Sequence, residues 1–140
     1  MNYKEYKSPS FIEAYKNAFT SGLDFDGRSR RAEYWKFLVL YYLLSIIVFA
    51  ISMMAIDTFD AEYVGWTIMI IFCLVHLLPR LSLQARRLHD IGRSAKMIFF
   101  LFVPFVGSAA YIVILIFSLF DSHKKGNNWG ESPKYYVEND

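Results

Sequence analysis

Two short arginine-rich motifs carry most of the side chains that could do chemistry in this sequence. Residues 25–37 read FDGRSRRAEYWKF, and residues 86–96 read RRLHDIGRSAK. A guanidinium group binds phosphate or carboxylate through two parallel hydrogen bonds, so each motif could hold an anionic lipid headgroup or an acidic partner protein. The residues predicted to do so are Arg28, Arg30, Arg31, Arg86, Arg87 and Arg93.

Two carboxylates accompany these arginines. Glu33 lies three residues after Arg30, and Asp90 lies four residues after Arg86 and three after Arg87. Both spacings bring side chains within ion-pair reach on one helix. Asp90 could instead pair with an arginine of the first motif. We therefore predict structural ion pairs at Glu33 and Asp90, with the partner of Asp90 left open between its own helix and the other motif.

The sequence His89-Asp90 invites a catalytic interpretation, in which a carboxylate orients an imidazole. Neighbouring residues on a helix point about 100° apart, however, so these two side chains cannot easily bond each other. The chain also lacks a nucleophile motif, a zinc-protease motif and a phosphate-binding loop. His89, His123 and Cys73 do not have the spacing of a metal site. We predict no catalytic residue, no metal and no cofactor, and we rank a lipid-modifying enzyme that uses His89 last.

Long apolar runs must position the two motifs. The chain of 140 residues is 55% hydrophobic and 19% aromatic, and residues 37–56 and 97–120 contain no charged side chain. A run of about 20 apolar residues can cross the hydrocarbon core of a bilayer as one helix. We predict an all-α, multi-pass membrane protein of one domain. It has about three membrane-spanning helices, over residues 37–56, 64–83 and 97–120, and a polar tail over residues 121–140.

Prolines interrupt the second and third apolar runs. Pro79 lacks an N–H and crowds the preceding turn, so we expect a kink in a helix that continues past Arg87. Arg80 beside it can extend its guanidinium to the headgroups. In the third run, Pro104 and Gly107 fit one kinked span, which is the simpler prediction. They also fit a re-entrant hairpin, since its two halves are each too short to cross.

A short amphipathic helix is predicted before the first apolar run, over residues 10–21. Ser10 and Glu13 have the spacing of a capping box, and Tyr15 and Phe19 recur on one face. Such a helix could lie in the membrane interface or pack against the ends of the spans, and the sequence favours neither. We expect no secretory signal peptide, so the first span should direct insertion.

The basic residues are distributed unevenly between the two sides of this topology. Of the 15 Lys and Arg residues, all but Lys124, Lys125 and Lys134 lie in residues 1–36 or 80–96. The positive-inside rule therefore places the N-terminus and the second link in the cytoplasm. With three spans the C-terminus lies on the opposite side, whereas a hairpin in the third segment would return it to the cytoplasm.

The order of these motifs resembles a family of small bacterial inner-membrane proteins known as domain of unknown function 805. The family pattern runs F-x-GR-x-x-R-x-E-Y-W, then RRLHD-x-GRS, then P-x-x-G, then G-x-N-x-x-G-x-x-P, and residues 15–133 follow it. One departure is Ala95-Lys96, where the family has a small residue and an aromatic one. A second is Lys124-Lys125-Gly126, which replaces a Gly-x-x-Gly turn. The resemblance implies a multi-pass protein of the bacterial inner membrane and brings no activity, substrate or cofactor.

We predict a non-enzymatic membrane protein whose cytoplasmic arginine motifs bind anionic lipid headgroups or a partner protein. Basic residues interleaved with membrane spans favour a headgroup over nucleic acid. The alternative is a small transporter or channel subunit that acts as a homo-oligomer or beside another membrane protein, because three spans enclose little by themselves. That alternative needs polar groups near mid-membrane, where His76 is one of few. His76 is predicted to hydrogen-bond between helices.

Overall fold

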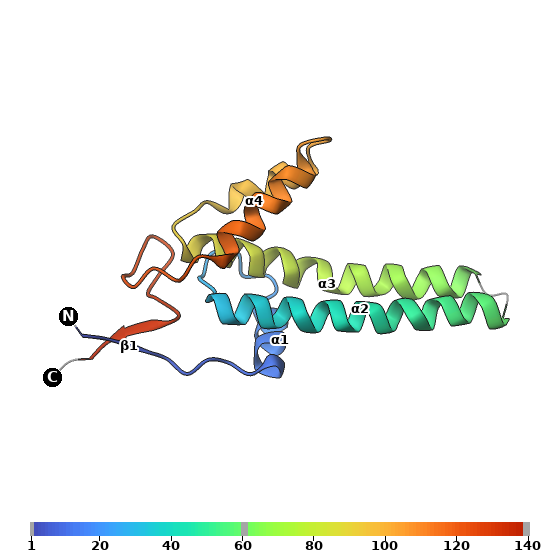
Figure 1. Ribbon diagram of the computed structural model, residues 1–140, viewed down its shortest axis with the longest axis horizontal. Helices are drawn as coiled ribbons and strands as arrows, with labels where there is room; N and C mark the ends of the chain where they lie inside the picture. The colour runs from blue at the N-terminus through green and yellow to red at the C-terminus, as the bar shows by residue number, and fades with distance from the viewer. Residues whose placement is uncertain (1, 60–61, 139–140) are drawn as a thin grey trace.

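The computed structural model describes residues 2–59 and 62–138, which are mostly helical, as predicted (Figure 1). Along the chain the elements are β1 (Tyr3–Glu5), α1 (Phe11–Thr20), α2 (Arg31–Phe59), α3 (Glu62–Asp90), the 3-10 helix η1 (Ala95–Phe102), α4 (Gly107–Leu119) and β2 (Tyr135–Val137). Two of them, α2 and α3, are long and apolar enough to cross a membrane. Residues 60–61, which connect these two helices, fall outside the described residues.

Helices α2 and α3 form one long antiparallel pair (Figure 1). Each has 29 residues, which is about 44 Å at about 1.5 Å per residue and exceeds a hydrocarbon core of roughly 30 Å. Large apolar side chains are exposed on α2 from Val39 to Met54 and on α3 from Tyr63 to Leu78. After Leu78 the character of α3 changes, because residues 82–90 are all buried by protein.

The buried C-terminal end of α3 belongs to a packed region that we call the polar cap, formed by residues 2–30, 79–94 and 120–138. Two apolar clusters pack this region against the rest of the protein. One, around Phe37 and Leu83, joins α1, α2 and α3. The other, around Leu88 and Ile98, joins α3 to η1. The arginine motifs therefore lie in a folded protein environment at one end of the helix pair.

Helix α3 runs unbroken through Pro79 and ends at Asp90, so the predicted continuation past Arg87 is confirmed. A proline inside a helix leaves one carbonyl without its N–H partner and needs room for its ring. Gly22 provides that room, because a Cβ there would lie 3.3 Å from the Pro79 ring. Ser82 Oγ also donates to the carbonyl O of Pro79 at 3.2 Å.

Helices α2 and α3 approach each other closely at Gly65. A Cβ on Gly65 would lie 2.8 Å from the carbonyl O of Ser52 and 2.6 Å from a side-chain carbon of Ile56. Ser52 is fully buried, and its hydroxyl donates to the carbonyl O of Val48 at 2.8 Å. Small residues allow helices to approach closely in a membrane, where tight packing replaces the hydrophobic effect as the driving force.

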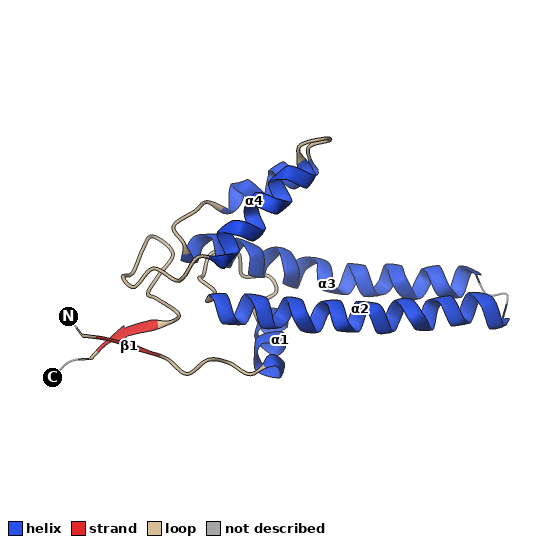
Figure 2. Ribbon diagram, viewed as in Figure 1, coloured by secondary structure: helices blue, strands red, loops and turns tan. Residues whose placement is uncertain are grey.

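Residues 97–120 do not form the single kinked span that was the simpler prediction. They fold as a hairpin in which η1 leads out and α4 leads back (Figure 2). Pro104 cannot donate a helical hydrogen bond, and Phe105 adopts a left-handed backbone with φ of 64°. Gly107 permits the close crossing, since a Cβ there would lie 2.5 Å from the carbonyl O of Leu101. The chain reverses at this point, which is the alternative that the sequence left open.

The two ends of the described chain form a small antiparallel sheet, in which Tyr3 pairs with Val137. The sequence did not predict these strands. Paired strands cannot lie on opposite sides of a bilayer, and Figure 1 shows both at the polar-cap end of the molecule. The two ends of the described chain therefore lie together, which fits the hairpin alternative, and the side of the membrane on which the C-terminus lies stays a prediction. The chain reverses at Phe105, so residues 97–120 do not continue as one helix.

Helix α1 begins with the predicted capping box. Ser10 Oγ accepts from the Glu13 N–H at 3.2 Å, and the Glu13 carboxylate accepts from the Ser10 N–H at 2.6 Å. Ala14 and Ala18 are fully buried against α2 and α3, while Ile12 is exposed. The packing alternative is thus the one that the structure shows, and an apolar edge of α1 remains uncovered.

Candidate functional site

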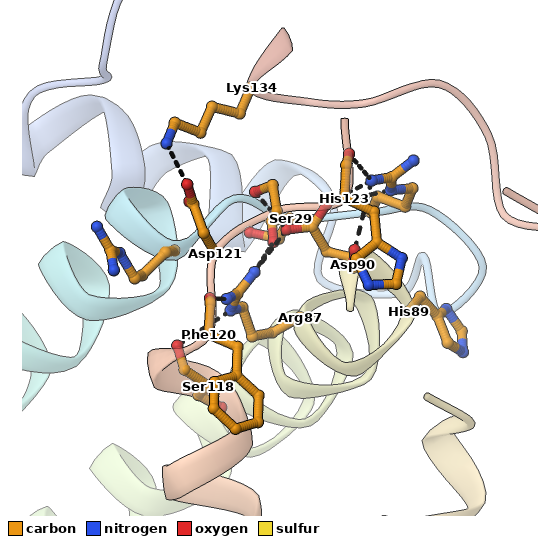
Figure 3. Close-up of polar contacts among 12 residues, drawn as sticks. Ser29, Arg87, His89, Asp90, Ser118, Phe120, Asp121, His123 and Lys134 are labelled. Carbon is orange, nitrogen blue, oxygen red and sulfur yellow. Dashed lines mark hydrogen bonds and ion pairs between the residues drawn. The ribbon is translucent and has the colours of Figure 1, made fainter. Parts of the chain in front are cut away.

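Asp90 joins the two arginine motifs (Figure 3). Its side chain is fully buried, with Oδ1 3.0 Å from Arg28 Nη2 and Oδ2 2.5 Å from Arg87 Nη1. Ser122 Oγ donates to Oδ2 at 2.6 Å. Both predicted arrangements are therefore present at once, since Asp90 pairs with an arginine on its own helix and with one from the other motif. The prediction that the two motifs meet in one place is confirmed.

The remaining donors of Arg28 and Arg87 point at the chain itself. Arg28 donates to four carbonyl groups, those of Asp90, His123, Lys125 and Gly130. Arg87 donates to three, those of Ser29, Ser118 and Phe120. The two side chains are 2% and 0% exposed. Their donors hold the tail against α3, and the predicted role of these two residues as ligands of lipid headgroups stays a prediction.

His89 has a packing role in the same region. Its Nδ1 faces the carbonyl oxygens of Asp26 at 3.2 Å and Gly27 at 3.3 Å, so this nitrogen carries the proton. The ring stacks on Trp129, with centroids 4.3 Å apart and planes 9° apart. Asn127 Nδ2 donates to the His89 carbonyl O at 2.9 Å. These contacts clamp the tail to the end of α3.

Arg30 and Arg86 are buried but incompletely bonded. Arg30 Nη1 donates to two carbonyl groups of the N-terminal segment, at 3.1 and 3.0 Å, whereas Arg30 Nε and Arg86 Nε and Nη2 have no partner among the described residues. Glu33 accepts from the Ser29 hydroxyl at 2.7 Å. The predicted ion pair of Glu33 with Arg30 is not among the pairs closer than 4.0 Å in the described chain. Burial lowers the pKa of Arg86, and the nearby Glu33 carboxylate opposes part of this shift.

Arg31 and Arg93 remain exposed, and both lie at the base of α4. Arg31 Nη1 donates to the carbonyl O of Leu119 at 3.3 Å. The Arg93 guanidinium lies 5.1 Å from the centre of the Phe117 ring. Of the six predicted binding residues, these two retain donors that a ligand outside the protein can reach.

His76 bonds between helices, as predicted. Its Nδ1 donates to the carbonyl O of Phe72 at 2.7 Å, which leaves Nε2 to accept from the Tyr15 hydroxyl at 2.6 Å. The aromatic rings of Phe19 and Tyr41 lie against the imidazole. His76 thereby fixes α1 to α3.

A second polar cluster, around Arg80, was missed at the level of sequence. The Arg80 guanidinium lies 5.2 Å from the ring centre of Tyr41 and 5.9 Å from that of Tyr42. The Tyr42 hydroxyl is in turn 3.0 Å from the Tyr111 hydroxyl on α4. The adjacent residues Tyr41 and Tyr42 on α2 were a weak signal for this arrangement, because tyrosines near a membrane surface are common.

The tail also carries an exposed charge cluster. Lys134 Nζ lies 2.6 Å from Asp121 Oδ2, and the Tyr135 hydroxyl donates to the same oxygen at 2.8 Å. Burial acts to raise the pKa of Asp121, but the hydrogen bonds from Lys134 and Tyr135 outweigh it and lower this pKa to about 2. Within residues 2–59 and 62–138, no group of three or more His, Cys, Asp or Glu side chains is placed to hold a metal ion.

Comparison with known proteins gives consistent matches. The family model described as "Protein of unknown function (DUF805)" matches residues 22–131. The chain is 31% identical over 124 residues to the inner membrane protein YhaI of Escherichia coli (strain K12), which covers 89% of this chain and 98% of that protein. It is 27% identical over 130 residues to the inner membrane protein YhaH of the same strain, which covers 88% and 98%. No solved structure matches it.

The family match spans both arginine motifs and the Asp90 centre that joins them. The relatives' names describe inner membrane proteins, which agrees with the two long apolar helices of this chain, and neither name carries an activity. This chain belongs to the family of proteins of unknown function DUF805.

Proposed function

We propose that this protein is a non-enzymatic protein of the bacterial inner membrane that holds anionic phospholipids at the membrane side of its polar cap. The observation that carries the proposal is the position of Arg31 and Arg93. Both are exposed, and both lie beside the last turn of α4, where the uncovered apolar surface of the hairpin meets the cap.

The η1–α4 hairpin supports a shallow position in one leaflet. Phe99, Phe102, Phe105 and Ile116 are among its many exposed apolar side chains, and such a surface is stable in hydrocarbon rather than in water. Its arms have 8 and 13 residues, which gives lengths of about 16 and 20 Å, short of the roughly 30 Å of a hydrocarbon core. The hairpin therefore enters and leaves by the same face, and the positive-inside rule assigns that face to the cytoplasm.

Arg31 and Arg93 would then lie at the level of the headgroups. Each basic residue near an anionic surface contributes about 1 kcal/mol to lipid attraction. Guanidinium also pairs with phosphate through two hydrogen bonds, so a phosphodiester suits these residues better than a single carboxylate.

Native mass spectrometry of the detergent-purified protein tests this proposal. We expect Arg31→Gln with Arg93→Gln to weaken retention of phosphatidylglycerol about 30-fold, which corresponds to about 2 kcal/mol for two basic residues. The matched control is Lys4→Gln with Lys7→Gln, which removes the same charge from exposed residues near the N-terminus. Equal retention in both double variants would show that general charge, and not the base of α4, attracts the lipid.

A further inference from the structure

A cavity of about 300 Å³ lies between α3, α2 and the η1–α4 hairpin, which diverges from the long helices (Figure 1). Its lining residues are Tyr34, Leu77, Arg80, Leu81, Gln84, Leu101, Gly107 and Tyr111. This volume is at the lower end of the range for ligand pockets, which is about 300–1,000 Å³. Neither Arg31 nor Arg93, the exposed arginines at the base of α4, is among these lining residues.

Arg80 is the one charged side chain in this lining. Its Nη2 lies 3.4 Å from the Tyr42 hydroxyl, a long contact with a neutral acceptor. No carboxylate lies within 4.0 Å of Arg80 in the described part of the chain. A guanidinium that is partly withdrawn from water and has no anionic partner is complementary to an anion that enters the cavity.

Two hydroxyl groups lie beside this charge. The Tyr42 and Tyr111 hydroxyls are 3.0 Å apart, and one of them donates to the other, which leaves the second proton free for a further acceptor. The Tyr34 hydroxyl, also in the lining, instead donates to Gln84 Oε1 at 2.5 Å. The donors available to a ligand are therefore concentrated around Arg80.

The rest of the lining is apolar. Leu77 and Leu81 on α3 face Leu101 on η1, and neighbouring side chains on both elements are exposed hydrophobics. Arg80 follows Leu78, the last large apolar side chain exposed on α3. The distance along α3 from Glu62 to Arg80 is about 27 Å, close to the roughly 30 Å of a hydrocarbon core. This length is suited to a helix that starts at one interface near Glu62 and brings Arg80 to the level of the phosphates at the other.

We propose that this cavity is a specific site for one anionic phospholipid, with Arg80 and a tyrosine hydroxyl bonded to its phosphate and its acyl chains against Leu77, Leu81 and Leu101. This inference deepens the proposed function, on which it rests for the presence of lipid at this level. Binding in the cavity depends on Arg80 and the leucines, whereas the lipid attraction proposed above depends on Arg31 and Arg93. A soluble phosphate would satisfy Arg80 but would leave the leucine walls uncovered.

The test is native mass spectrometry of the purified full chain with phosphatidylglycerol, at a collision energy that removes weakly held lipid. We expect the wild type to keep one phosphatidylglycerol and Arg80→Gln to keep it about tenfold less well, since one charge-assisted contact is lost. Arg31→Gln with Arg93→Gln should leave this one lipid in place. Leu77→Trp retains the charge of Arg80 but narrows the cavity, so it should also release the lipid. This second variant tests the site even if Arg80→Gln fails to fold.

Three results would overturn the inference. The first is equal retention by the wild type, Arg80→Gln and Leu77→Trp. The second is displacement of the lipid by millimolar inorganic phosphate, which would assign the site to a soluble anion. The third is equal retention of phosphatidylcholine, which would remove the role of charge. Loss of lipid in the Arg31 and Arg93 double variant alone would support the proposed function and contradict this site.

Discussion

Asp90→Asn is the change that most severely tests the role of the polar cap. The substitution keeps the shape of the side chain but removes the negative charge between Arg28 and Arg87, which lies 3.0 and 2.5 Å from their nitrogens. Both guanidiniums are buried, so neither can recover its interaction from water. Breaking a buried ion pair by removing one partner costs about 3–5 kcal/mol. We expect a loss of this size in the free energy of unfolding.

Unfolding in increasing mole fractions of sodium dodecyl sulfate, followed by tryptophan fluorescence, measures this loss. Trp129 stacks on His89, next to the mutated residue, and reports on the tail directly. The matched control is Asp121→Asn. The Asp121 side chain is 43% exposed, and its carboxylate pairs with Lys134. An exposed pair contributes about 0–1 kcal/mol. If Asp90→Asn costs no more than Asp121→Asn, the buried Asp90 centre does not hold the cap together.

Three further predictions follow from the packing. Gly65→Ala should lower the free energy of unfolding by about 1–3 kcal/mol, measured in the same titration, because the added Cβ meets the Ser52 carbonyl O at 2.8 Å. Tyr15→Phe should cost about 0.5–1.5 kcal/mol, since His76 loses the hydroxyl that it accepts from, and an unchanged stability would contradict this contact. The pKa of Asp121 is lowered from 3.8 to about 2, so its stabilising contribution is present above pH 3.8 and is lost as the pH falls toward 2. The midpoint of thermal unfolding should therefore drop more over this interval in the wild type than in Asp121→Asn, and an equal drop would contradict this role of Asp121.

Local spacing was sufficient to predict the contacts made within one helix or between sequence motifs. The capping box at Ser10 and Glu13 needs only two residues at the correct separation. Asp90 lay within reach of Arg87 on the same helix, and the short connection between α2 and α3 made its approach to Arg28 predictable. The continuity of α3 through Pro79 followed from the shortness of the apolar run before it.

The features that the sequence did not determine depend on tertiary contacts. Pro104 and Gly107 are compatible with a kink or a reversal, and the choice depends on the left-handed backbone of Phe105 and the close approach of Gly107 to Leu101. Carbonyl groups that accept from Arg28 come from the tail, far away in the chain, so these contacts could not be predicted from local spacing. The three-residue strands are too short to give a pattern.

The path of the η1–α4 hairpin is the central claim, because it decides which side of the membrane the tail and the polar cap share. A dual reporter, with one enzyme active only in the cytoplasm and one only in the periplasm, can be fused to the C-terminus and, in a second protein, to the N-terminus. A third fusion in the loop between α2 and α3 serves as the control and should report the periplasm. We expect both terminal fusions to report the cytoplasm. A C-terminal fusion that reports the periplasm would show that residues 97–120 cross the membrane and would contradict the hairpin.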